Sequence, residues 1–117
     1  MHARAKNGNG NGTKLLTEAM DAAEEAGLRY VSDERPGYTR KAITDEFEFF
    51  DTEGKAIHDE QHLLRIKRLA IPPAWTDVWI CPSANGHIQV TGRDARRRKQ
   101  YLYHERWQFE TKTSTIA

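Results

Sequence analysis

The chain has 117 residues, of which 30% are charged and one is a cysteine, and this length suits a single soluble domain with one modest core. The lone Cys81 excludes an internal disulfide and a multi-cysteine metal site. No apolar run approaches the roughly 20 residues that span a bilayer, and the N-terminus lacks the apolar stretch of a secretory signal, so we expect a cytoplasmic protein.

The formal net charge of +1 conceals a segregation of charge along the chain. Residues 1–60 carry 8 basic and 13 acidic side chains, a balance of −5, whereas residues 61–117 carry 10 basic and 4 acidic side chains, a balance of +6. The second half is therefore expected to form an electropositive face.

The N-terminal region divides into a leader and a helix. Residues 1–12 end in NGNGNG, whose high chain entropy predicts a disordered leader. From Thr13, a potential N-cap, apolar residues recur at helical spacing as far as Gly27 and predict a helix. The apolar stripe comprises Leu15, Leu16, Ala19, Met20, Ala22, Ala23 and Ala26. The opposite face carries Glu18, Asp21, Glu24 and Glu25, and is expected to lie away from any nucleic acid.

The next segments have the patterns of strands and turns. Residues 28–31 are predicted to form a short strand, followed by a turn in SDERPGY. Residues 40–50, where phenylalanines alternate with glutamates, predict one longer strand. A tight reversal at 51–54 then leads into residues 55–57, which predicts a first hairpin at this point.

A second helix and a central strand are expected after this hairpin. Asp59 can cap a helix that mixes apolar and basic residues and must end near Ala70, because Pro72 and Pro73 cannot continue it. Residues 76–81, TDVWIC, are rich in β-branched and aromatic side chains and predict a central strand with a buried thiol.

The most informative stretch is QVTGRDARRRKQYLYHERW, residues 89–107. Its pattern predicts a hairpin with arms at 87–91 and 100–104 and a basic turn between them. Six of these residues are basic and two, Asp94 and Glu105, are acidic. The basic residues are Arg93, Arg96, Arg97, Arg98, Lys99 and Arg106. Such cations neutralise phosphates, and a two-stranded ribbon fits the major groove of duplex DNA.

Alternation along the return strand separates its side chains into two sets. Tyr101 and Tyr103 share one face, while Gln100, Leu102 and His104 share the other, with Leu102 directed to the core. The tyrosines are expected to contact bases and phosphates, and Gln100 suits adenine if strand twist near the turn brings it beside them. The alternative is a solvated basic turn with the tyrosines packed on a neighbouring strand.

No catalytic or metal-binding cluster competes with this hairpin. Only His58 and His62 have the i, i+4 spacing of metal ligands, and neither a third ligand nor a catalytic Glu accompanies them. Cys81 lies in an apolar strand pattern that would raise its pKa, and no nucleophile elbow is present. The chain is therefore expected to be non-catalytic by itself and to use no cofactor.

Three strings carry a resemblance to a known family: LRYVSDERPGY, IPPAWTDVWICPSANGHIQVTGRD and GRDxxxRKQYxYH. Together they resemble the N-terminal domain of the bacterial, poxvirus-like type IB DNA topoisomerases over roughly residues 27–107. The resemblance and the elements above predict an α+β fold with a small antiparallel sheet of about five strands and two or three short helices. The domain is expected to span 13–107, with 108–117 beginning a linker to a missing catalytic domain.

The resemblance also implies roles for individual residues. Gln100, Tyr101 and Tyr103 match the family's QYxY positions, which touch bases and backbone in the major groove, and neither tyrosine is the nucleophile. Arg98 and Lys99 are implied phosphate contacts, and Arg93, Arg96 and Arg97 are further cations for the same role. Relatives commonly have Gly in place of Arg97, at a turn position where positive φ favours Gly.

The full-length enzyme implied by this family relaxes supercoiled DNA without ATP or metal. A tyrosine in a C-terminal catalytic domain breaks one strand through a 3′-phosphotyrosyl link and then religates it. The expected partners are double-stranded DNA and that domain, for a monomer at the cytoplasmic nucleoid. Two other functions remain open: a protein-interaction module whose basic hairpin meets an acidic partner, and a single-strand or RNA binder that stacks bases on the tyrosines.

Overall fold

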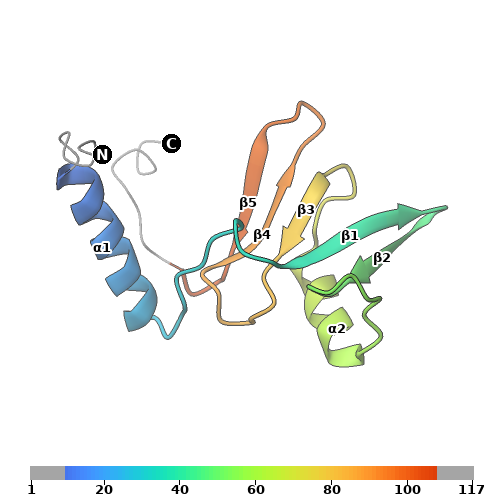
Figure 1. Ribbon diagram of the computed structural model, residues 1–117, viewed down its shortest axis with the longest axis horizontal. Helices are drawn as coiled ribbons and strands as arrows, with labels where there is room; N and C mark the ends of the chain where they lie inside the picture. The colour runs from blue at the N-terminus through green and yellow to red at the C-terminus, as the bar shows by residue number, and fades with distance from the viewer. Residues whose placement is uncertain (1–9, 108–117) are drawn as a thin grey trace.

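The computed structural model describes residues 10–107 and confirms an α+β fold with a five-stranded antiparallel sheet and two helices in that part of the chain. The strand order is β2-β1-β3-β4-β5, so the predicted central strand, β3, is central (Figure 1). The elements are α1 (Gly10–Glu25), β1 (Tyr38–Ile43), β2 (Glu46–Phe50), α2 (Glu60–Leu69), β3 (Thr76–Ile80), β4 (Ile88–Arg93) and β5 (Lys99–Tyr103).

Helix α2 covers one face of the sheet and has the predicted ends. The Asp59 side chain accepts hydrogen bonds from the backbone N–H groups of Gln61 and His62, which satisfies two donors of the first turn. Ala70 ends the helix in the left-handed conformation, just before the prolines. The core beneath the helix consists of Ile66, Val78, Ile80 and Val90, with Leu102 packed against it.

The opposite face of the sheet is defined by the strand register. Trp79 pairs with Thr91, and Thr91 with Tyr101, so these side chains project together on the side away from α2. We call this side, which α2 does not cover, the open face. It comprises Thr39 and Lys41 of β1, Trp79 of β3, Thr91 and Arg93 of β4, and Lys99, Tyr101 and Tyr103 of β5.

The predicted strand at 28–31 is wrong. This segment makes only one isolated bridge, between Arg29 and Gly86. Its backbone groups are used elsewhere, because Leu28 N–H closes the end of α1 on the Ala23 carbonyl and Val31 N–H donates to the His87 ring. This segment therefore contains residue types that are common in strands, but it is irregular.

The prediction of one strand over 40–50 is also wrong. The chain turns at residues 44–45, and β1 pairs with β2 from Thr39↔Phe50 to Ile43↔Glu46. Thr44 has φ 57°, a turn conformation that the strand-like pattern of its neighbours concealed. The expected reversal at 51–54 does occur, but beyond it only Ala56 makes a bridge, to Phe50.

Helix α1 begins earlier and buries less than expected. It starts at Gly10, three residues before the predicted N-cap at Thr13. The first turn tolerates these Gly and Asn residues, because its N–H groups have no intrahelical acceptors. Residues 1–9 and 108–117 lie outside the described part, where the leader and linker predictions fall. Of the stripe, Ala19 and Ala23 are buried, whereas Leu15, Leu16 and Met20 are exposed. Neither described helix is long and apolar enough to cross a membrane.

Candidate nucleic-acid interface

The predicted hairpin exists and projects from the sheet. Strands β4 and β5 pair from Val90↔Leu102 to Arg93↔Lys99, and their turn extends beyond the end of β3 (Figure 1). Gly92 allows this pairing, because a Cβ there would lie 2.8 Å from the Trp75 ring that packs beneath the strand. The result is a narrow two-stranded ribbon with its tip free of the core.

Asp94 organises the basic turn. Its Oδ1 accepts the backbone N–H groups of Arg96 and Arg98, each at 2.9 Å, and its Oδ2 accepts from Arg98 Nε and Gln100 Nε2, also at 2.9 Å. These hydrogen bonds, that from the Arg98 backbone above all, lower the pKa of Asp94 to about 2. Arg97 completes the turn with φ 65°, so it adopts the positive φ for which relatives commonly have Gly.

The cations at the tip differ in their partners. Arg98 pairs with Asp94 at 2.9 Å, and Lys99 pairs with Asp33 of a distant loop. Arg93 donates to the carbonyl of Arg97 at 3.2 Å and, like Arg96 and Arg97, has no carboxylate partner within residues 10–107. The side chains with the greatest freedom to bind an external anion are therefore Arg93, Arg96 and Arg97.

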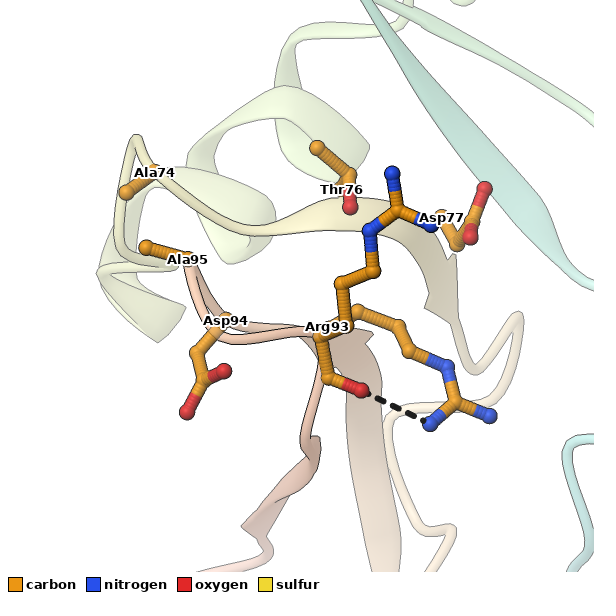
Figure 2. A pocket seen from close by; sticks show the side chains of 7 residues that line it. Ala74, Thr76, Asp77, Arg93, Asp94 and Ala95 are labelled. Carbon is orange, nitrogen blue, oxygen red and sulfur yellow. Dashed lines mark hydrogen bonds between the residues drawn. The ribbon is translucent and has the colours of Figure 1, made fainter.

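A shallow hollow of about 600 Å³ lies between this turn and the start of β3. Thr76 and Asp77 stand at its β3 side, and Asp94 and Ala95 at its turn side (Figure 2). The dashed line in Figure 2 is the bond from the Arg93 guanidinium to the turn backbone. Two arginines, two aspartates and small residues line the hollow. The lining is therefore polar, but charge of one sign does not dominate it. The lining residues are Ala74, Thr76, Asp77, Arg93, Asp94, Ala95 and Arg97.

The two tyrosines lie as the alternation predicts. Tyr101 is 43% and Tyr103 50% exposed, and their rings stack with centroids 5.9 Å apart and an angle of 11° between planes. Leu102 between them points to the core. Partial burial is the main cause that raises the pKa of Tyr103, and the nearby Tyr101 and Tyr30 raise it further, so its hydroxyl stays protonated. The alternative in which both rings pack on a neighbouring strand is not what the structure shows.

Gln100 does not join the tyrosines. It pairs with Gly92 on the face of Leu102, is half-buried, and donates its amide to Asp94. Strand twist near the turn is too small to overcome the alternation, and the carboxylate offers the amide a strong acceptor. Its proposed match to adenine stays a prediction, because it requires the Asp94 contact to break.

The structure adds a residue that sequence reasoning missed, Asp33. It lies in the loop before β1 and reaches the open face, where Thr91 Oγ1 donates to its Oδ2 at 2.9 Å and Lys99 forms an ion pair with the same oxygen. The hydrogen bond from Lys99 is the main cause that lowers the pKa of Asp33. The sequence gives no signal for this contact, since Asp33 appears there as one turn residue among several.

An aromatic cluster ties the segment before β1 to the base of the hairpin. The buried His87 stacks on Tyr30 with centroids 4.2 Å apart, and Trp107 lies 4.6 Å from the same imidazole. His87 Nδ1 accepts the Val31 N–H at 3.0 Å, which requires this nitrogen to be unprotonated. Burial lowers the pKa of His87. No group of three or more His, Cys, Asp or Glu side chains within residues 10–107 could hold a metal ion.

Part of this sheet is similar to a known protein family. Residues 46–94, from β2 to the beginning of the basic turn, match the family described as the N-terminal domain of bacterial DNA topoisomerase IB. The fold and this match support an N-terminal domain of the type IB DNA topoisomerases, as the resemblance predicts.

A curated relative supports the same assignment. DNA topoisomerase 1B of Acanthamoeba polyphaga mimivirus is 38% identical over 69 residues, which are 59% of this chain and 20% of the viral protein. The chain thus spans about a fifth of the length of the relative it matches. Strand β5, with Gln100, Tyr101 and Tyr103, lies beyond the family match at 46–94, so its roles rest on the geometry above.

Proposed function

We propose that this domain binds duplex DNA with the open face and inserts the β4–β5 ribbon into the major groove. One observation carries the proposal: a stacked, half-exposed tyrosine pair lies on a projecting ribbon whose tip holds three arginines without carboxylate partners among residues 10–107. Arginines suit phosphates, and tyrosine rings suit base edges and thymine methyl groups.

The proposal extends to the longer protein. There the domain would grip DNA while a C-terminal catalytic domain relaxes supercoils through a transient single-strand break and a 3′-phosphotyrosyl intermediate, without ATP. In that enzyme, an isomerase of the cytoplasmic nucleoid acting as a monomer, Tyr101 and Tyr103 are contacts and not nucleophiles. The raised pKa of Tyr103 agrees with this, because an attacking phenol needs a base or a lowered pKa.

Phosphate contact is tested by titrating a labelled duplex at rising salt with the protein and its Arg96→Ala variant. Arg96 is exposed, and its backbone N–H, not its side chain, bonds to Asp94 in the turn. Replacing its side chain should therefore leave the fold intact. We expect binding that weakens with salt, and a salt slope reduced by about one unit in the variant. Lys55→Ala is the matched control, because it removes an exposed cation far from the ribbon. Absence of duplex binding, or affinity that ignores salt, would contradict the proposal.

Base contact is tested by replacing both tyrosines, Tyr101→Ala with Tyr103→Ala. Each lost base contact should weaken duplex affinity by about 1–3 kcal/mol, while the salt slope stays unchanged because no cation is removed. Unchanged duplex binding combined with loss of a protein partner would favour the interaction module instead. A preference for single strands over duplex would favour base stacking on the rings.

A further inference from the structure

The centre of the open face is covered by a crossing loop, residues 32–37. The Trp79 indole N–H donates to the Arg35 carbonyl at 2.8 Å, and the indole packs so tightly on Gly37 that a Cβ there would overlap it. Asp33 is the third attachment, through Thr91 and Lys99. The crossing loop therefore presents a carboxylate in a fixed place beside the tyrosine pair.

This carboxylate is only partly used by the protein. Its two side-chain partners, Thr91 Oγ1 and Lys99 Nζ, both contact Oδ2, and no other residue within 10–107 donates a hydrogen bond to Oδ1. The Asp33 side chain is 21% exposed, so a ligand on the open face can reach it. Asp94, by contrast, uses both oxygens on four donors of its own hairpin.

Lys99 forms an ion pair with this carboxylate. Its ammonium contacts Asp33 and lies 5.8 Å from the centre of the Tyr101 ring. The carboxylate offsets the charge of this ammonium, so the arginines of the turn, which have no carboxylate partner within residues 10–107, should attract phosphates more strongly. The open face thus has a nearly neutral centre at Asp33 and Lys99 and a cationic tip.

A neutral centre with an acceptor suits base edges and not the DNA backbone. An ionised carboxylate can only accept hydrogen bonds, and a phosphodiester has no hydrogen to donate. In the major groove the available donors are the amino groups at N4 of cytosine and N6 of adenine. We propose that Asp33 is a specificity-determining residue that accepts a hydrogen bond from such an amino group, and that Lys99 is its positioning residue; this inference rests on the proposed function.

The test selects bound duplexes from a pool with randomised base pairs and compares the protein with Asp33→Asn. We expect the unmodified domain to enrich cytosine or adenine at one position by roughly fivefold, the low end of base-edge discrimination. The variant should lose that enrichment, because an amide can also donate to the acceptors of guanine and thymine, and its salt slope should not fall, because no cation is removed. Glu34→Gln is the matched control: it removes the same charge from the same loop and should keep the preference.

A second variant separates base reading from support of the loop. Thr91→Val removes a tie to the crossing loop but leaves the carboxylate in place, so it should keep the preference. The inference is overturned if Asp33→Asn binds with the same preference as the unmodified domain, or if Thr91→Val loses it equally. If neither protein binds any duplex, the proposed function fails and this inference with it.

Discussion

Arg97 combines an unfavourable backbone conformation with an exposed cation. Its φ of 65° lies in the left-handed region, which costs a residue with a Cβ about 1–2 kcal/mol. Its side chain has no carboxylate partner within residues 10–107 and lines the hollow beside β3. Arg97 therefore lowers the stability of the fold but supplies a positive charge at the ribbon tip.

Replacing Arg97 by Gly should separate these two effects. The variant is expected to be more stable by about 1 kcal/mol, because glycine adopts positive φ without strain, and to lose about one unit of salt slope in duplex binding. Thermal unfolding and a salt titration measure the two quantities.

Arg96→Gly serves as the control for this change, since it removes a neighbouring cation at a residue without positive φ. It should lower the salt slope similarly and reduce stability. A fall in stability for Arg97→Gly as large as that for Arg96→Gly would contradict the strain argument.

At the scale of elements, the sequence predicts those whose signals are local. Asp59, Ala70 and the two prolines delimit α2 because capping and proline geometry act within a few residues. The predicted alternation of Tyr101, Leu102 and Tyr103 is confirmed, because one face of β5 is exposed and the other is partly buried. The breaks at 44–45 and 28–31 were missed, because a two-residue turn and an irregular crossing segment leave the apolar pattern almost unchanged.

The C-terminus of α2 offers a test of such a local signal. Ala70 has φ 52°, so Ala70→Gly should raise stability by about 0.5–1 kcal/mol once the greater freedom of glycine in the unfolded chain is subtracted. Ala42→Gly, exposed in β1 without positive φ, should lower it by about 0.5–1 kcal/mol. Chemical denaturation of both variants checks the sign, and destabilisation by Ala70→Gly would refute the capping account.

The junction between the crossing segment and the hairpin should respond to pH. Burial depresses the pKa of His87 in the folded state, so the unfolded chain binds more protons below its ordinary value of 6.5. Stability should therefore decrease as pH falls below about 6.5, down to the lower pKa of the folded state. His87→Gln, which can still accept the Val31 N–H, should flatten this dependence. Unfolding midpoints between about pH 8 and about pH 5 measure the effect, and identical profiles would exclude His87 as its source.

At the scale of the whole molecule, the segregation of charge agrees with the arrangement of elements. The acidic residues Glu18, Asp21, Glu24 and Glu25 are exposed on α1, which stands apart from the β4–β5 ribbon (Figure 1). The contacts at the centre of the open face were beyond sequence reasoning for a different reason. Asp33 and Thr91 are 58 positions apart, and only the path of the crossing loop over the sheet brings them together.

The most direct test of DNA binding by the open face is a map of amide chemical shifts during titration with a duplex. We expect perturbations that cluster at residues 93–103 and in the crossing loop, with α2 on the covered face unaffected. Perturbations centred on α2 or α1, with the ribbon silent, would contradict it.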